Sequence, residues 1–418
     1  MSKKRSINLP RRRFIAGAGA AATATGVGLG FSQAVNAGSG SAPTKLFVYL
    51  FLRGGIDGLS FVVPTGGANF NHYAQDRDAT FIEPNEPLNL FGSQFGLHPF
   101  CTALHSIAPR VAIVHACGHP LDALTRSHFD AQETIELGTP GNLSGVSGFL
   151  NRYLQTQNHS PDAIFTALAS SSNPPTSMAG YPDIATLDSA GGFSPNSGTF
   201  ADTHLMMLDS MYSGTGSLDL AAQSTVDAVN LINSFDLDDY QPAGGVSYPN
   251  TGLGSDLALI AQLWKLDLGI STATVDRGGW DTHNTQNTLN PNGGFGRNIA
   301  EVSDAVTAFY LDIANDPVKN ENDICLVIQS EFGRQVSENG NAGTDHGYAD
   351  PMVLIGGLIT GGLYGTFPSI ATGDRIGDGV MPTTDFRNVH ATVMDRVLGN
   401  GPGVVSQVFP DLNYQPVF

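Results

Sequence analysis

The stretch KLFVYLFLRGGIDG at residues 45–58 decides the fold class. Its first part, residues 45–52, is a continuous apolar run of strand length, which is typical of a strand covered on both faces. The Gly-rich turn that follows presents one carboxylate, Asp57. Asp and Gly are also common in turns of no functional importance. The stretch therefore predicts a buried strand of a mostly parallel sheet, followed by a turn with a candidate metal ligand.

Further strands and helices alternate along the rest of the chain. Apolar runs predict strands at residues 111–115, 270–275, 324–329 and 352–355. Apolar residues at helical spacing predict helices at residues 218–235, 255–266, 297–315 and 385–398. This alternation indicates an α/β fold with a large, mostly parallel sheet and helices on both faces. In such sheets, functional groups collect at the carboxyl ends of the strands.

The N-terminus and the middle of the chain differ from the rest in composition. Residues 1–37 combine an Arg-Arg-Arg motif, an Ala/Gly-rich apolar stretch and a small-residue cleavage site, the features of a twin-arginine signal peptide. We expect a linker at residues 38–44 and one α/β domain at residues 45–418, with an insertion or cap at residues 155–255. The sequence thus predicts export by the twin-arginine machinery to the periplasm or beyond, with no stable membrane span in the mature form.

The charge balance restricts the partners. Residues 1–37 hold six Lys/Arg and no acid, so the mature chain has 14 Lys/Arg against 38 Asp/Glu, a net charge of −24. Such a chain is repelled by nucleic acid and by anionic membrane surfaces. An anionic substrate would require a bound cation to reverse the field locally. Of the three cysteines, Cys101 and Cys117 either form a disulfide or are small buried hydrophobes, as Cys325 is expected to be.

Three polar motifs lie in the last third of the chain. They are Gly-Gly-Trp-Asp-Thr-His at 278–283, Gln-Ser-Glu-Phe-Gly-Arg at 329–334 and Gly-Thr-Asp-His-Gly at 343–347. Carboxylates and imidazoles at strand ends are ligands for a divalent metal. The sequence predicts a metal site, for zinc, calcium, magnesium or manganese, made by Asp57, Asp281, His283, Glu331, Asp345 and His346.

Asp281 and His283 are the strongest pair of this set. In an extended loop, residues i and i+2 point to the same side, so both side chains can reach one ion. Glu331 follows a predicted buried strand after one residue, and the alternative is a surface ion pair with Arg334, worth about 0–1 kcal/mol. The alternative for residues 345–347 is a simple turn.

A hydroxyl motif at residues 125–130, Thr-Arg-Ser-His-Phe-Asp, precedes a predicted helix. Ser127 or Thr125 either caps that helix or acts as a nucleophile in the field of the helix N-terminus. Arg126 is a candidate partner for an anionic substrate group. His128 either serves the site or turns inward for packing, and structural roles are expected for His98, His115 and His119.

Five motifs together resemble the exported bacterial family called domain of unknown function 1501. The resemblance extends from about residue 46 to the C-terminus, and the motifs that carry it are Leu-Arg-Gly-Gly-Ile-Asp-Gly, Arg-Ser-His-Phe-Asp-Ala, Gly-Gly-Trp-Asp-Thr-His, Ser-Glu-Phe-Gly-Arg and Thr-Asp-His-Gly. The family looks like a branch of the alkaline phosphatase and sulfatase superfamily. This resemblance implies a large mixed α/β sheet that carries one or two metals.

The resemblance also implies roles for single residues. Ser127, with Thr125 as the fallback, matches the hydroxyl nucleophile of the superfamily. Its metal ligands match Asp57, Asp281, His283, Glu331 and His346. Many members carry Asp-His at the later acidic position, whereas Phe332 follows Glu331 here, so two metals would require Asp345 or His128 as a further ligand. The element Cys117-Gly-His-Pro does not match the C-x-P-x-R pattern, which argues against a formylglycine-type sulfatase.

The functional hypothesis is therefore an exported, metal-dependent hydrolase of phosphate or sulfate esters, borne by a small molecule or a polymer. Ser127 and Arg126 are its predicted catalytic residues. One alternative is a secreted, non-catalytic binding or assembly protein that retains the fold. Another is a single-metal site that binds without turnover.

Overall fold

The computed structural model describes residues 45–142, 144–160, 163–187, 201–216, 219, 222, 226 and 240–418. The predicted signal peptide and linker, and most of the helix predicted at residues 218–235, lie outside these residues. Within the described part, no helix is both long enough and apolar enough to cross a bilayer.

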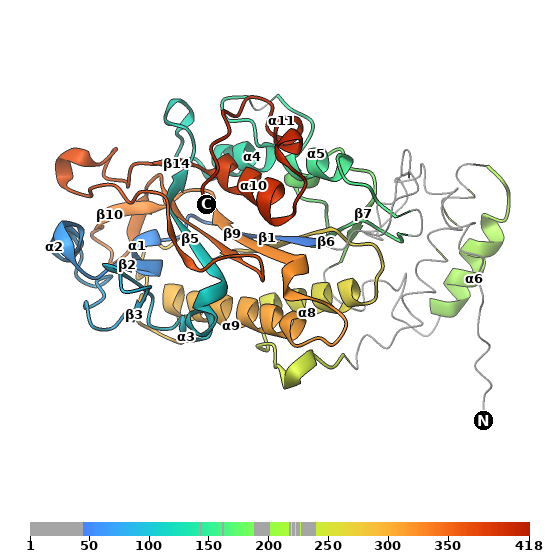
Figure 1. The fold of residues 1–418 in the computed structure, drawn as a ribbon, viewed down its shortest axis with the longest axis horizontal. Helices are drawn as coiled ribbons and strands as arrows, with labels where there is room; N and C mark the ends of the chain where they lie inside the picture. Colours follow the sequence, from blue (N-terminus) through green and yellow to red (C-terminus); the bar gives the residue numbers. More distant parts are fainter. Residues whose placement is uncertain are drawn as a thin grey trace.

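A nine-stranded sheet forms the centre of the molecule (Figure 1). Its order is β13 (Gly362–Tyr364), β5 (Val111–Gly118), β12 (Asp350–Ile355), β9 (Ile324–Ser330), β1 (Leu46–Leu52), β8 (Thr272–Arg277), β6 (Ala167–Ser170) and β7 (Ile184–Thr186), with β14 (Thr384–Asp385) paired to β5. The two pairs made by β12 are antiparallel, and the other pairs of this sheet are parallel. The predicted mostly parallel α/β sheet is confirmed.

Helices cover both faces of the sheet, because β1 is apolar on both sides. Its side chains Leu46, Val48, Leu50 and Leu52 pack in one core cluster with α8 (Gly252–Lys265) and α9 (Gly294–Ala314). Phe47, Tyr49 and Phe51 pack in another cluster with α4 (His128–Leu137), α5 (Phe149–Gln155), α10 (Phe386–Thr392) and α11 (Pro402–Val408). Figure 1 shows these two sets of helices on opposite sides of the sheet. Each fully buried large side chain contributes about 1.5–3 kcal/mol to this packing.

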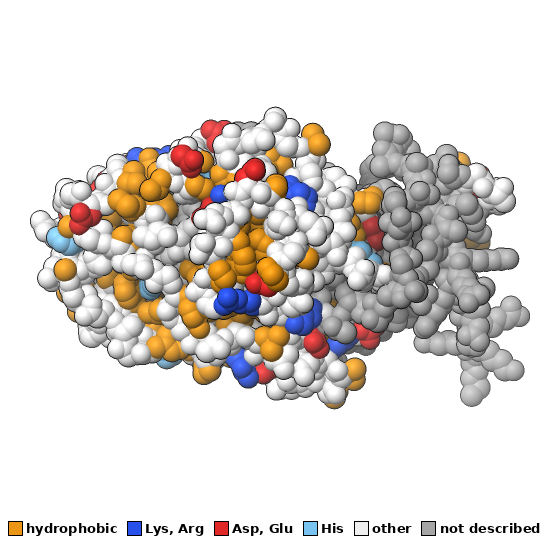
Figure 2. Space-filling model, turned by 45° about the horizontal axis from the view of Figure 1, so that its top comes forward, with side chains coloured by type: hydrophobic (Ala, Val, Ile, Leu, Met, Phe, Trp, Pro, Cys, Tyr) orange, Lys and Arg blue, Asp and Glu red, His pale blue; other side chains and the backbone are white. Residues whose placement is uncertain are grey.

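The described residues also form several smaller elements. They are α1 (Gly58–Phe61), α2 (Gly67–Asp76), α3 (Thr102–Ser106), α6 (Ala201–Met211), the sheet of β2 (Val62–Pro64), β4 (Phe95–Leu97) and β3 (Leu88–Asn89), and the pair β10 (Arg334–Glu338) and β11 (Thr344–His346). On the face shown in Figure 2, charged side chains of the described residues are few and scattered, and no broad basic patch is visible.

Part of the predicted insertion belongs to the main sheet. Strands β6 and β7 fall within residues 155–255, where the sequence analysis predicted an insertion or cap. These two strands were not predicted because they are only four and three residues long, too short for a periodic signal. Cys101, Cys117 and Cys325 are buried and free, so the cysteines act as small apolar side chains.

The antiparallel direction of β12 brings the segments of the candidate site to one rim of the sheet. The chain leaves β1, β8 and β9 at one rim of the sheet, and the antiparallel β12 starts at that same rim. The loops after Leu52, Arg277 and Ser330 therefore meet the segment that precedes Asp350. This rim carries the predicted metal ligands.

The buried histidine His115 gives the fold a measurable pH dependence. Its ring packs against Phe95 and Phe367, with ring centroids 4.6 and 5.4 Å away. Burial lowers the pKa of His115 to about 4. This pKa lies below the value of about 6.5 in the unfolded chain. The contribution of neutral His115 to the free energy of unfolding is therefore fully present above pH 6.5 and is lost as the pH falls toward 4.

We expect His115→Phe, which keeps the aromatic packing but removes the titration, to be less sensitive to acid. Between pH 7 and pH 5, its free energy of unfolding should fall by about 2 kcal/mol less than that of the wild type. Urea unfolding at the two pH values measures this difference. Equal losses in both proteins would contradict the assignment.

Candidate metal centre

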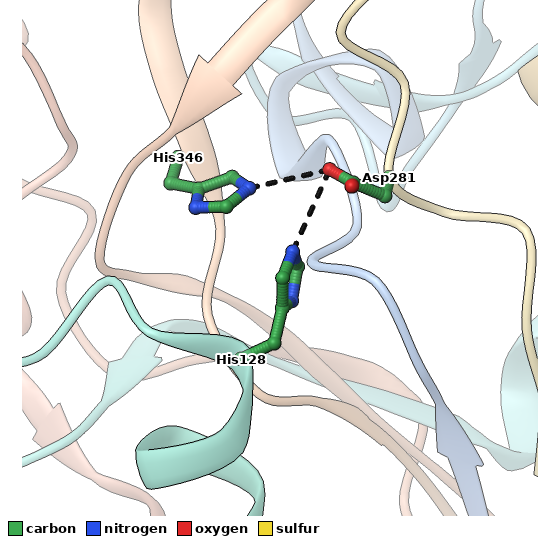
Figure 3. A group of neighbouring side chains, drawn as sticks. All are labelled: His128, Asp281 and His346. Carbon is green, nitrogen blue, oxygen red and sulfur yellow. Dashed lines mark hydrogen bonds and ion pairs between the residues drawn. The ribbon is translucent and has the colours of Figure 1, made fainter.

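Four side chains from three segments converge at the rim of the sheet. His128 begins α4, Asp281 and His283 lie in the loop after β8, and His346 ends β11. Oδ1 of Asp281 lies 3.0 Å from Nε2 of His283, 3.2 Å from Nε2 of His346 and 3.6 Å from Nε2 of His128. Figure 3 shows His128 and His346 pointing at this carboxylate. Among the residues that the structure describes, His128, Asp281 and His346 are the group whose ligand atoms all lie within 4.8 Å of one another.

The other ring nitrogen of each histidine has an oxygen partner. Nδ1 contacts Oε1 of Glu331 at 2.7 Å for His128, Oδ1 of Asp345 at 2.7 Å for His283, and the carbonyl oxygen of Arg126 at 2.9 Å for His346. A carbonyl or carboxylate oxygen only accepts, so each Nδ1 donates, and in the neutral ring each Nε2 keeps a lone pair. Metal-binding histidines have this arrangement, in which the outer partner fixes the tautomer and the ring.

The Nε2 lone pairs converge on the carboxylate of Asp281. A cation between these electron-pair donors would be stabilised. Nε2 of His283 lies 2.8 Å from Nε2 of His346, so two acceptors face each other. Nε2 of His128 is buried and has no hydrogen-bond partner. A buried polar atom without a partner is rare and requires an explanation. Three imidazoles and a carboxylate form a donor set that fits a divalent metal.

The local sequence explains how these side chains reach the rim. Oγ of Ser127 accepts from the backbone N–H of Asp130 at 3.4 Å, which places His128 at the first turn of α4. Gly54 has φ +126°, and a Cβ there would lie 2.5 Å from the backbone nitrogen of Asp281. Only glycine permits both this conformation and this close approach.

Arg334 connects the loops of the site by hydrogen bonds. Its side chain is fully buried and donates to the carbonyl oxygens of Gly55 at 2.7 Å and Thr344 at 2.8 Å, and to Oδ1 of Asp281 at 2.6 Å. Although partial burial opposes it, the guanidinium holds the pKa of Asp281 below its ordinary value. Glu331 and Arg334 do not form the surface ion pair considered as the alternative. Glu331 contacts His128, whereas Arg334 contacts Asp281.

Replacement of Arg334 by methionine should strongly destabilise the protein. The carbonyl groups of Gly55 and Thr344 would remain buried without a donor, at a cost of about 3–5 kcal/mol. Lysine should restore only part of this, because one ammonium cannot span the partners of a planar guanidinium. Urea unfolding measures both variants. Arg110→Met, which removes a partly exposed pair with Glu321, is the control and should cost below about 1 kcal/mol; a similar cost for Arg334→Met would contradict the prediction.

Two predicted ligands, Glu331 and Asp345, contact the imidazoles from the side away from the candidate cation site. Glu331 is buried, and its Oε1 also accepts from the N–H of Gly54 at 2.8 Å and from Nε2 of Gln132 at 2.9 Å. Together with the hydrogen bond to His128, these donors lower the pKa of Glu331 against the effect of burial. Asp345 is about half exposed and orients His283. The structure thus places both carboxylates as partners of the histidines.

Asp57 is not brought into the cluster. It is buried and forms a two-pronged ion pair with Arg77, with Nη1 2.5 Å from Oδ2 and Nη2 2.9 Å from Oδ1. The guanidinium occupies both carboxylate oxygens, and His128 takes the place in the cluster that the sequence analysis left open. Arg77 was missed because no local signal links it to Asp57.

The predicted catalytic residues lie next to the cluster in sequence. Ser127 directly precedes His128. The guanidinium of Arg126 lies 4.4 Å from the ring centroid of Tyr348 and donates to the carbonyl oxygens of Ile376 and Gly377. Its Nε is buried without a partner.

A pocket of about 540 Å³ runs along α4. Its α4 wall carries Phe129, Gln132, Glu133 and Glu136, and its opposite wall is the segment 171–176. Gln132 belongs to both the pocket and the cluster, through its hydrogen bond to Glu331. The sequence analysis did not single out these residues; the i, i+3, i+4 spacing of the α4 wall is the signal that was present.

Residues 258–400, which carry Asp281, His283 and His346, match the model of a known protein family. The family is "Protein of unknown function (DUF1501)". The match confirms the predicted resemblance to DUF1501 over these residues. His128 lies outside the part that matches the DUF1501 model. No curated protein matches the sequence significantly.

Several solved structures are similar to this chain at low sequence identity. A protein in the alkaline phosphatase superfamily from Vibrio parahaemolyticus is 9% identical, with a TM-score of 0.32 over 78% of this chain and 64% of its own. The alkaline phosphatase of the Antarctic bacterium TAB5 is 11% identical, with a TM-score of 0.32 over 76% and 92%. Lipooligosaccharide phosphoethanolamine transferase A of Neisseria meningitidis is 12% identical, with a TM-score of 0.32 over 77% and 49%. The chain spans less than two thirds of the first and third of these proteins.

Proposed function

We propose that the chain is a metal-dependent hydrolase of phosphate or sulfate esters. His128, His283, His346 and Asp281 would hold the cation. The observation that carries this proposal is the convergence of three imidazole Nε2 atoms on one carboxylate, with every Nδ1 bonded to an oxygen. Nitrogen donors favour zinc or a similar transition metal, since calcium and magnesium prefer oxygen ligands.

Ser127 is the proposed nucleophile, with Thr125 as the alternative. Its Oγ lies at the N-terminus of the ten-residue helix α4, whose unpaired N–H groups and dipole stabilise negative charge. A bound cation would lower the pKa of an attacking hydroxyl and neutralise charge on the ester. Arg126 would pair with an ester oxygen through its guanidinium.

The pocket along α4 is the proposed place for the remainder of the substrate. Its opposite wall offers the hydroxyl and amide groups of Ser171, Ser172 and Asn173, and Phe129 provides an aromatic edge that is 87% exposed. Glu133 and Glu136 would repel an anionic group there. The ester could be borne by a small molecule or by a polymer, in the periplasm or outside the cell after twin-arginine export.

Metal analysis and hydrolysis assays test the proposal. Protein purified from the periplasm should hold about one cation per chain, and it should hydrolyse an aryl phosphate or an aryl sulfate. A chelator should abolish hydrolysis, and added zinc should restore it. Metal without hydrolysis would favour the alternative of a binding site without turnover. Protein without metal would leave only the non-catalytic binding or assembly role.

A further inference from the structure

A buried glutamine joins the two segments that carry His283 and His346. Oε1 of Gln286, which is fully buried, accepts from Oγ1 of Thr282 at 2.8 Å and from Oγ1 of Thr344 at 2.9 Å. Thr282 lies between Asp281 and His283, and Thr344 lies two residues before His346. One amide oxygen therefore fixes the separation of two ligand-bearing segments.

Asp57 sets the orientation of this amide. Nε2 of Gln286 donates to Oδ2 of Asp57 at 2.7 Å. Although burial opposes it, the Arg77 guanidinium holds the pKa of Asp57 below its ordinary value, so the carboxylate is ionised and only accepts. If the amide were reversed, its oxygen Oε1 would face the negatively charged carboxylate of Asp57 and would be repelled. The amide NH₂ must face Asp57, and the amide oxygen must face the two threonines.

The same network also holds the strand opposite His346. Nε of Arg77 donates to the carbonyl oxygen of Val336 at 2.9 Å, and Nη2 donates to that of Gln335 at 3.0 Å. Both carbonyls belong to β10, which pairs with β11 so that Arg334 is opposite His346. The ion pair with Asp57 thus connects the loop after β1 to the hairpin that presents His346.

We propose that Asp57 and Gln286 are positioning residues of the metal centre, which set its affinity by fixing the spacing between the His283 and His346 segments. This inference rests on the proposed metal-dependent function. It gives Asp57 a role different from the ligand role that the sequence analysis predicted. Neither residue contacts the cation site; each acts through the threonines that flank the ligands.

Four variants of the full mature chain test the proposal. Gln286→Met removes both sets of hydrogen bonds at nearly constant length, and Thr282→Val and Thr344→Val remove one each. Thr288→Val is the matched control, because the buried Oγ1 of Thr288 contacts the other end of the amide, Nε2, at 3.2 Å. Zinc affinity is measured by competition with a chromogenic chelator, and urea unfolding of the metal-free proteins measures stability.

We expect Gln286→Met to weaken zinc binding by about 10-fold, the lower end of the range for loss of an outer partner of a metal ligand, because Gln286 contacts the threonines beside the ligands and not the ligands. Thr282→Val and Thr344→Val should each weaken it less, and they carry the test if Gln286→Met does not fold. Thr288→Val should lose resistance to urea but keep the wild-type affinity.

Equal weakening by Thr288→Val and Thr344→Val would overturn the positioning role, and so would unchanged affinity in Gln286→Met. Wild-type protein that binds zinc but hydrolyses no ester would refute the hydrolase while the affinity ratios still support positioning. Wild-type protein that binds no zinc would overturn both proposals.

Discussion

The His346→Ala variant should bind its cation far more weakly than the wild type, and it should lose ester hydrolysis. Nε2 of His346 lies 3.2 Å from Oδ1 of Asp281 and 2.8 Å from Nε2 of His283, so it is central to the donor set. A site of four ligands binds zinc with about 10–16 kcal/mol, and the loss of one ligand should weaken affinity on the order of 10²- to 10³-fold. Chelator competition and aryl ester hydrolysis measure the two effects.

His72→Ala is the matched control for this experiment. His72 lies on α2, outside the cluster, and is only partly buried. Its removal should leave both zinc affinity and hydrolysis unchanged. Wild-type affinity in His346→Ala would contradict the proposed ligand set, whereas a loss of affinity in both variants would indicate a general effect on folding.

The Ser127→Ala variant should keep its metal and lose hydrolysis by several orders of magnitude. A nucleophile forms a bond with the substrate, so no neighbouring group replaces it at the same position. Ser127 also caps α4, and loss of the cap alone should cost about 1 kcal/mol of stability. Zinc competition, urea unfolding and hydrolysis by the same preparation separate these two roles.

Thr125→Ala is the comparison for Ser127. Oγ1 of Thr125 accepts from the backbone N–H of Ser127 at 3.1 Å, so this change also disturbs the start of α4. Thr125→Ala should keep most of the hydrolysis. If Ser127→Ala is as active as the wild type, Ser127 is only a helix cap, and an inactive Thr125→Ala would then identify the nucleophile.

Long apolar runs made the centre of the fold predictable. Strands β1 and β9 are buried on both faces, and such strands appear in the sequence as continuous hydrophobic segments. Strands β6 and β7 were not predicted because three or four residues give no periodic signal. The direction of β12 was not predictable either, since strand direction depends on the path of the connection and not on composition.

The candidate site was predictable where its residues are neighbours in the chain. Asp281 and His283 were paired from their spacing, and the structure places them 3.0 Å apart. The role of His128 depends on Glu331, which lies 203 positions away. Contacts at such separations are set by the topology of the sheet. The same reason explains why Asp57 was expected at the metal although its charge is neutralised by Arg77.

The central place of β1 has a consequence for biosynthesis. This strand leaves the ribosome early, but both of its neighbours in the sheet, β8 and β9, are made much later. Until then the nascent chain presents an apolar strand with two open edges, the kind of segment that associates with other chains. The proposed ligand set is complete only after the residues up to His346 have been translated and the sheet has closed, so the proposal places metal loading after synthesis of these segments.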